Sequence, residues 1–132
     1  MGCNSHPYIE VKKDDKWEYF KECEESRNYL LYSFLAGVRN GNGVTPVVAP
    51  RGLPENASKE VKEALYDYDP LAFHSFTWLT PEEFYEAIEK TKSFKYEEFG
   101  ISTEWKNIKN TLISLQEEFG KENVRLVLGF DS

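Results

Sequence analysis

The C-terminal part of the chain combines a helical and a strand pattern, and this succession restricts the fold more than any other feature. Apolar side chains recur at alternating spacings of three and four from Trp105 to Phe119, which predicts an amphipathic helix that Gly120 ends. Apolar residues then occupy alternate positions from Val124 to Phe130, which predicts a strand. A helix leading into a strand predicts an α+β fold.

An N-terminal hairpin is predicted by two short strand patterns over residues 8–13 and 17–20. If residues 14–16 form the loop, Val11 lies opposite Tyr19, and one face of the hairpin is apolar. Four side chains are then expected to face the core. They are Ile9, Val11, Trp17 and Tyr19.

Helices in the middle of the chain are predicted by composition and capping residues. Residues 27–39 are apolar on almost all sides, which is typical of a buried helix. Ser58 can cap a helix that runs to about Tyr66. Thr80-Pro-Glu-Glu83 is a capping box with proline at the first helical position, so a helix is expected from Pro81 to about Lys92.

The length of 132 residues and the mass of 15.4 kDa suit one domain, residues 1–132. The expected fold class is therefore α+β. A small antiparallel sheet, formed by the N-terminal hairpin and the C-terminal strand, packs against three to four helices. The Gly- and Pro-rich segment 40–55 is a long loop, and loops of this length are usually functional or disordered.

Charge and cysteine content limit the partners that we expect. The formal charge is −7, whereas a long nucleic acid or an anionic membrane favours a basic surface, so neither is an expected partner. No apolar run approaches the roughly 20 residues of a membrane span. Two cysteines, Cys3 and Cys23, are too few for a disulfide scaffold, which favours a reducing, cytoplasmic compartment. The sequence leaves homo-oligomerisation open.

Two segments concentrate the side chains capable of acid–base or polar chemistry. Residues 1–10 contain a thiol, an amide, the imidazole of His6 and the carboxylate of Glu10. Residues 73–80 contain His74, the second of the two histidines, among aromatic residues. We expect both segments and the 40–55 loop to converge on one site.

Two arginines are candidates for binding an anion. Arg51 lies between two prolines, Pro50 and Pro54, and a rigidly presented guanidinium suits bidentate contact with phosphate. Arg39 follows the predicted buried helix. The alternatives are an ion pair between Arg51 and a carboxylate, and neutralisation of helix C-terminal carbonyl groups by Arg39.

The histidines allow several kinds of chemistry. His6 and His74 could serve as general base and acid on a phosphodiester, without a metal. Alternatively, each imidazole satisfies a hydrogen bond in the core. Cys3 and His6 have the spacing of half a zinc site, or could form a nucleophile pair, but the second Cys/His pair has the wrong spacing for a compact zinc motif. We therefore expect neither a metal nor a cofactor.

Several segments resemble a family of small, mostly uncharacterised phage and prophage proteins whose members typically open with Met-Gly-Cys-Asp-Ile-His. The similarity extends in the same order over nearly the whole chain. It is carried by Met1-Gly-Cys-Asn-Ser-His, Arg27-Asn-Tyr, Leu35-Ala-Gly-Val-Arg-Asn, Pro50-Arg-Gly-Leu-Pro, His74-Ser-Phe-Thr-Trp-Leu-Thr and Val124-Arg-Leu-Val-Leu-Gly-Phe-Asp. The chain departs from the pattern at Asn4, where Asp is usual, and at Phe76, where a further His is common.

This resemblance implies a setting in the cytoplasm of an infected bacterium, where small phage proteins disarm nucleotide-signalling defences. The leading hypothesis is binding, by sequestration, of a small phosphate-containing, nucleotide-derived ligand that serves as an immune signal. Alternatives are a metal-independent phosphodiesterase with His6 and His74 as catalytic residues, and a protein-binding inhibitor of a host factor. Whether the protein is an enzyme stays open. The expected ligand-binding residues are Tyr8, His6, Glu10, Arg39, Arg51, His74 and Trp78.

Overall fold

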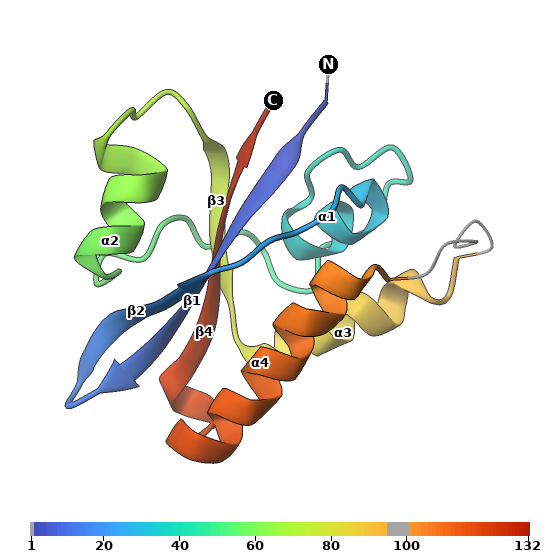
Figure 1. Cartoon of the computed structure of the whole chain (residues 1–132). Coiled ribbons are helices and arrows are strands. Elements are labelled where there is room, and N and C mark those ends of the chain that lie inside the picture. Colours follow the sequence, from blue (N-terminus) through green and yellow to red (C-terminus); the bar gives the residue numbers. More distant parts are fainter. Residues whose placement is uncertain (1, 95–100) are drawn as a thin grey trace.

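The computed structural model describes residues 2–94 and 101–132, and it contains a four-stranded antiparallel sheet with helices on both faces (Figure 1). The strand order is β2-β1-β4-β3. The strands are β1 (Asn4–Lys13), β2 (Lys16–Glu22), β3 (His74–Leu79) and β4 (Val124–Asp131). The predicted α+β class is confirmed, and the N-terminal hairpin pairs with the C-terminal strand as expected.

The helices divide between the two faces of the sheet (Figure 1). Three cover one face and the shortest covers the other. They are α1 (Tyr29–Ala36), α3 (Pro81–Thr91) and α4 (Thr103–Phe119) on the first face, and α2 (Lys59–Lys62) with its π-helical continuation η1 (Glu63–Asp67) on the second. A short 3₁₀ turn, η2 (Lys121–Asn123), joins α4 to β4. None of the helices within residues 2–94 and 101–132 combines the length and hydrophobicity that crossing a bilayer requires.

Local capping residues determine where the helices begin and end. The side chain of Asn28 accepts a hydrogen bond from the Leu31 N–H, and Gly37 adopts the left-handed conformation (φ 71°), so α1 is shorter than the predicted 27–39 helix. The capping box between Thr80 and Glu83 is present at the start of α3, as predicted.

Two hydrophobic cores lie on opposite faces of the sheet. The larger one joins β1 and β4 to α1, α3 and α4, and Trp105, Phe84 and Tyr32 are among its fully buried side chains. The smaller one joins the sheet to α2, around Val61 and Leu65. Because β4 is central and covered on both faces, every residue from Val124 to Phe130 is buried.

The predicted register of the N-terminal hairpin is wrong. Asp14 and Asp15 alone form the turn, both with positive φ (52° and 61°), so Glu10 lies opposite Tyr19 and Val11 opposite Glu18. A shift of one residue moves every side chain to the other face of the sheet. Tyr19, and Trp17 with it, therefore lie on the face of α2 and not beside Val11 in the larger core.

Strand β3 was not predicted as a strand. Its pairing with β4 is irregular between His74 and Thr77, and Ser75 has a positive φ of 57°. The 40–55 loop packs against this strand, because the Gly52 N–H donates to the Phe76 carbonyl oxygen (3.0 Å) and the Arg51 N–H donates to Thr77 Oγ1 (3.1 Å). These two hydrogen bonds hold residues 51 and 52 of the loop against β3.

Candidate functional site

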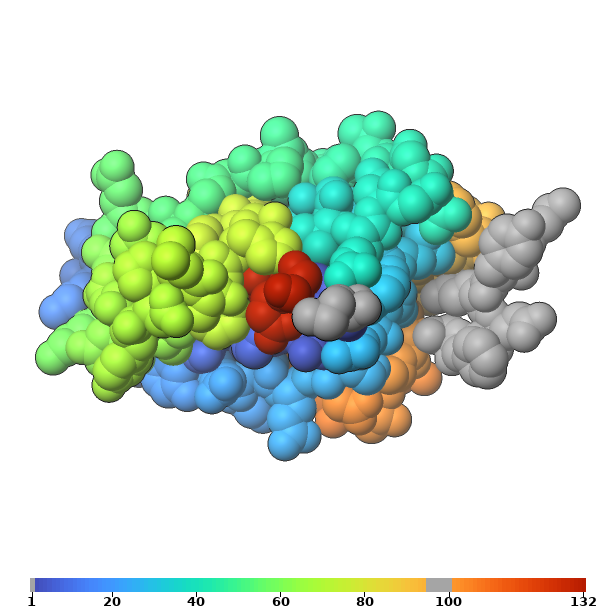
Figure 2. Space-filling model, turned by 90° about the horizontal axis from the view of Figure 1, so that it is seen from above, coloured from blue at the N-terminus to red at the C-terminus, as the bar shows by residue number. Residues whose placement is uncertain are grey.

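The start of β1 and the end of β4 lie side by side at one end of the sheet (Figure 2). The polar side chains gathered there form the candidate site. We call these residues the terminal cluster. It comprises Asn4, His6, Arg27, His74, Asp131 and Ser132.

His6 and Asp131 form the central pair of the terminal cluster. His6 Nε2 lies 2.8 Å from Asp131 Oδ2, and the backbone N–H of Asn4 donates to Asp131 Oδ1 at 3.0 Å. Burial raises the pKa of the Asp131 carboxyl, but the hydrogen bonds from His6 and Asn4 outweigh it and hold this pKa below its usual value. Asp131 is therefore a carboxylate that orients the His6 ring.

His74 lies at the same end of the sheet. Its Nε2 is 2.6 Å from Ser132 Oγ, and its Nδ1 is 2.8 Å from Ser75 Oγ. Asp131 and Ser132 are consecutive, so the two imidazoles contact neighbouring residues at the end of β4. The structure thus brings the two histidine segments to one end of the sheet.

Arg27 is a member of the terminal cluster that the sequence did not place among the ligand-binding residues. Its Nε donates to Asn4 Oδ1 at 2.8 Å, and its guanidinium lies so close to Gly2 that a Cβ atom there would overlap it. The neighbouring Cys3 N–H donates to the hydroxyl of Tyr29 (3.0 Å), and Arg39 lies 5.4 Å from the centre of the Tyr29 ring. Gly2 in the opening motif was the feature of the sequence that could have indicated the close approach of the Arg27 guanidinium to the backbone.

A cavity of about 540 Å³ opens beside the terminal cluster, within the size range of small-molecule sites. One of its glutamates, Glu25, is turned into the protein. Its Oε1 accepts hydrogen bonds from the Ser5 N–H (2.6 Å), the Ser5 hydroxyl (2.8 Å) and the Tyr32 hydroxyl (2.6 Å). The lining residues are Asn4, Ser5, His6, Glu22, Cys23, Glu24, Glu25 and Arg27.

Glu10, expected beside His6 in the site, is instead part of a buried ion pair. Its Oε1 lies 2.7 Å from Nη2 and 2.8 Å from Nε of Arg125, and its Oε2 accepts a hydrogen bond from the Ser58 N–H (2.7 Å). Glu10 is fully buried and Arg125 is 4% exposed. Glu10 therefore holds α2 against the sheet.

Arg51 and Trp78 contact each other on the face of α2. The two terminal nitrogens of Arg51 donate to the two carboxylate oxygens of Glu83 (2.6 and 2.7 Å), and its guanidinium carbon lies 4.1 Å from the centre of the Trp78 ring. This is the ion pair that the sequence left as the alternative for Arg51. Tyr8 is buried beneath Glu22, and burial raises its pKa to about 12. The candidate residues thus divide between the terminal cluster and the face of α2.

The thiols do not take part in the terminal cluster. Cys3 is fully buried in the larger core, whereas His6 packs against Phe73 on the opposite face of the sheet, with ring centres 4.6 Å apart. This placement contradicts the alternative of a Cys3–His6 nucleophile pair. Burial raises the pKa of the Cys23 thiol to about 11. In the part of the chain that the structure describes, no three His, Cys, Asp or Glu side chains are arranged to hold a metal ion.

No protein-family model, curated protein or solved structure matches this chain. The resemblance to small phage proteins stays a prediction, and Met1 of the opening motif lies outside the described residues. The two positions that depart from that resemblance both lie beside the His6–Asp131 pair. Asn4 donates its backbone N–H to Asp131, and the Phe76 ring rests on Gly129, the residue of β4 opposite His6.

Proposed function

We propose that the protein binds and sequesters a small phosphate-containing, nucleotide-derived ligand at the terminal cluster. One observation carries this proposal: His6 and His74 contact consecutive residues at the end of β4, and His6 and Arg27 line a cavity beside them. A guanidinium group and a protonated imidazole can both bind phosphate oxygens through charge-assisted hydrogen bonds. The phage setting implied by the sequence resemblance suggests a bacterial immune signal as the ligand.

Arg27 is the strongest phosphate-binding candidate. Its hydrogen bond to Asn4 uses Nε, and that bond fixes the plane of the guanidinium against Gly2. The paired terminal nitrogens of a guanidinium suit two oxygens of one phosphate. Arg51, which the sequence favoured for this role, already makes the same bidentate contact with Glu83.

The charge around the cavity favours a phosphodiester over a phosphomonoester. Glu22 and Glu24 line the cavity together with Arg27, and the whole chain carries −7. Like charges repel a ligand more strongly as its own charge rises. A phosphodiester carries one negative charge, so it experiences less repulsion than a monoester with nearly two.

An enzymatic alternative uses the same residues. A carboxylate that orients an imidazole, as Asp131 orients His6, is a common arrangement for a general base. His74 would then protonate the leaving oxygen of a phosphodiester. This alternative predicts that the bound ligand is cleaved, whereas sequestration predicts that it stays intact.

Recovery of bound ligand distinguishes these possibilities. The protein is incubated with cyclic di-AMP or ADP-ribose, separated from free ligand, denatured, and the released compound is analysed by chromatography. Intact ligand supports sequestration, and a product supports the phosphodiesterase. If the protein retains neither cyclic di-AMP nor ADP-ribose, nor a product of either, the proposal is wrong.

Matched variants locate the site. Arg27→Gln and His74→Ala should each weaken binding about ten-fold or more, because each removes a hydrogen bond to a charged group. Lys90→Gln also removes one positive charge, but from α3, where Lys90 pairs with Glu86 (3.5 Å). Equal affinity in Arg27→Gln and Lys90→Gln would place the ligand elsewhere.

The third function class, inhibition of a host protein, is favoured by a different surface. Tyr68 and Leu71 are 83% and 94% exposed in the connection between η1 and β3. Exposed apolar side chains that gather in one contiguous patch are typical of protein contact sites. Loss of a biological activity in Leu71→Ser, without loss in Arg27→Gln, would favour this class over ligand binding.

A further inference from the structure

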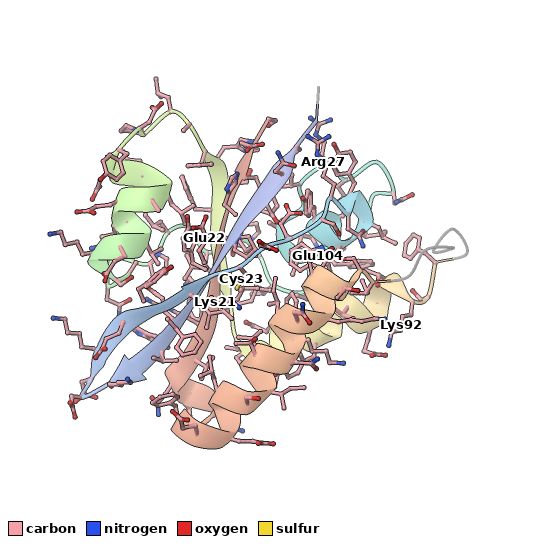
Figure 3. The ribbon with its side chains drawn as sticks, viewed as in Figure 1. Lys21, Glu22, Cys23, Arg27, Lys92 and Glu104 are labelled. Atoms are coloured by element: carbon pink, nitrogen blue, oxygen red, sulfur yellow. The ribbon has the colours of Figure 1, made fainter. Side chains whose placement is uncertain are left out.

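A second cavity, of about 390 Å³, adjoins the first one along the end of β2. The two cavities share Glu22, Cys23 and Glu24 in their linings. Figure 3 shows Glu22 and Cys23 at the end of β2, with Glu104 on the neighbouring α4. The two cavities therefore meet at residues 22–24.

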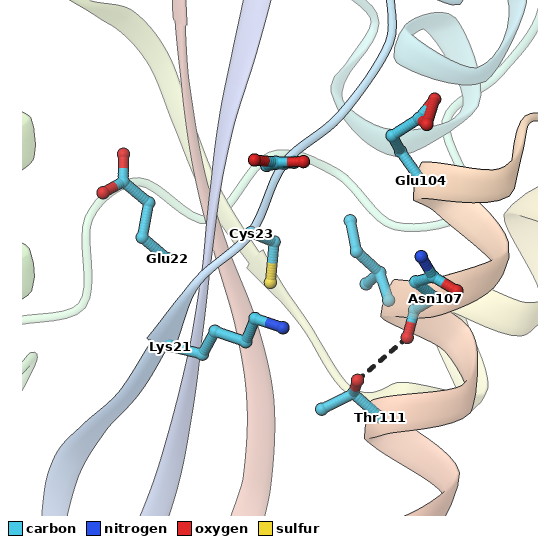
Figure 4. Close-up of a pocket in the computed structure, with 8 residues that line it drawn as sticks. Lys21, Glu22, Cys23, Glu104, Asn107 and Thr111 are labelled. Atoms are coloured by element: carbon cyan, nitrogen blue, oxygen red, sulfur yellow. Dashed lines mark hydrogen bonds between the residues drawn. The ribbon is translucent and has the colours of Figure 1, made fainter.

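The second cavity lies between β2 and α4 (Figure 4). Glu104, Asn107 and Thr111 line it from α4, and their spacings of three and four place them on one face of that helix. Lys21 and Cys23 point toward them from the other side. Polar groups thus line the rim on both sides of the cavity.

The side chains in this cavity suit the edge and the face of a nucleobase. The Thr111 hydroxyl donates to the backbone carbonyl oxygen of Asn107 (2.9 Å), so this hydrogen bond does not involve the side-chain amide of Asn107. An amide both donates and accepts, which matches the amino group and ring nitrogen of adenine. Ile108 also lines the cavity. The Cys23 thiol is uncharged near neutral pH, because burial raises its pKa to about 11. Both side chains can therefore pack against a flat ring.

We infer that the second cavity is the base subsite of the ligand and that it selects a base bearing an exocyclic amino group, as adenine does. The carboxylate of Glu104 can accept a hydrogen bond from an amino group but repels the keto oxygen that replaces it in hypoxanthine. Together with Asn107 it distinguishes the two bases. This inference rests on the proposed function, because the phosphate at the terminal cluster positions the base.

Titration calorimetry with two matched probes tests the inference. Cyclic di-AMP and cyclic di-IMP have the same charge and backbone and differ in the exocyclic amino and keto groups. We expect cyclic di-AMP to bind about ten-fold or more tightly, because the keto oxygen of hypoxanthine cannot donate a hydrogen bond to the Glu104 carboxylate. Asn107→Ala should reduce this preference by weakening the binding of cyclic di-AMP. Glu104→Gln should reduce it by tightening the binding of cyclic di-IMP, because the carboxylate that repels the keto oxygen is lost.

The control variant is Lys106→Gln, an exposed residue of the same helix that does not line the cavity. It should keep the preference for cyclic di-AMP. If both probes bind equally and Arg27→Gln weakens both, the base subsite is wrong and the proposed function stands. If neither probe binds, both proposals fail. All three substituted side chains lie on the solvent-facing side of α4 or line the cavity, so circular dichroism should show an unchanged fold.

Discussion

Glu10 on β1 and Arg125 on β4 lie directly opposite each other and form an ion pair inside the smaller core. Arg125 Nη1 also donates to Asn56 Oδ1 (3.1 Å), and the guanidinium carbon lies 4.0 Å from the centre of the Trp17 ring. Because Ser58 donates its N–H to Glu10, the pair connects the start of α2 to the two central strands.

Breaking this pair should strongly destabilise the protein. Arg125→Met leaves the Glu10 carboxylate buried without its counter-charge, and we expect a loss of about 3–5 kcal/mol in the free energy of unfolding. Urea denaturation followed by tryptophan fluorescence measures this loss.

The control for this prediction is the double variant Glu10→Leu with Arg125→Met. Since both charges are removed together, most of the stability should return. A double variant as unstable as the sum of the two single variants would show that the two residues are not coupled.

Acid should abolish the contribution of the Arg51–Glu83 pair. The hydrogen bond from Arg51 lowers the pKa of Glu83 despite the opposing effect of burial. A carboxylate with a lowered pKa in the folded state stabilises above its unfolded pKa and loses this effect as pH falls through the folded value. Glu83→Gln keeps the capping box but should cost about 1 kcal/mol near neutral pH.

Denaturation midpoints measured across pH check this expectation. The difference between wild type and Glu83→Gln should shrink as pH falls below about 4. A difference that stays constant into acid would mean that the pair with Arg51 is not its source.

Gly2→Ala should weaken ligand binding more than stability. The added Cβ displaces the Arg27 guanidinium, which is exposed and free to rotate away, so the unfolding free energy should change by less than about 1 kcal/mol. The ordered position of Arg27 beside Asn4 is lost. Parallel calorimetry and denaturation separate the two effects.

Gly41→Ala is the matched glycine control, because a Cβ there meets no other atom within 4 Å. It should leave ligand affinity unchanged. If Gly2→Ala binds cyclic di-AMP as tightly as Gly41→Ala does, Arg27 is not positioned by Gly2.

The two thiols should react slowly in the native protein. Both Cys3 and Cys23 are buried, and burial raises the pKa of Cys23 to about 11. Such a pKa lowers the thiolate fraction near neutral pH on the order of a hundredfold compared with a free cysteine. A thiol reagent should label both residues only after denaturant is added, and rapid labelling of the native protein would contradict the burial of one of them.

Local signals predicted the helices and the last strand well. The capping box at Thr80 and the alternation from Val124 depend on neighbouring residues only, so α3 and β4 could be recognised in the sequence. The hairpin register failed because two aspartates with positive φ form a shorter turn than we expected. Strand β3 was missed because its pairing is irregular at Ser75.

The candidate site was harder to predict because its residues are paired by distant contacts. Residue type alone suggested that Arg51 and Glu10 were available to a ligand. In the structure, Arg51 is paired with Glu83 and Glu10 is paired with Arg125. Both partners lie far away in the sequence. Arg27 was not among the expected ligand-binding residues, and only the folded chain shows that it lies against Gly2.

The pairing of β1 with β4 has a consequence for synthesis on the ribosome. The central pair joins Asn4 to Asp131 and Val11 to Val124, so the middle of the sheet cannot close until residue 131 has left the exit tunnel. Until then, β1 can pair with β2 alone, and an isolated two-stranded hairpin is marginally stable in water. Folding should therefore be slow for a chain of this size, because its central contacts are distant in the sequence.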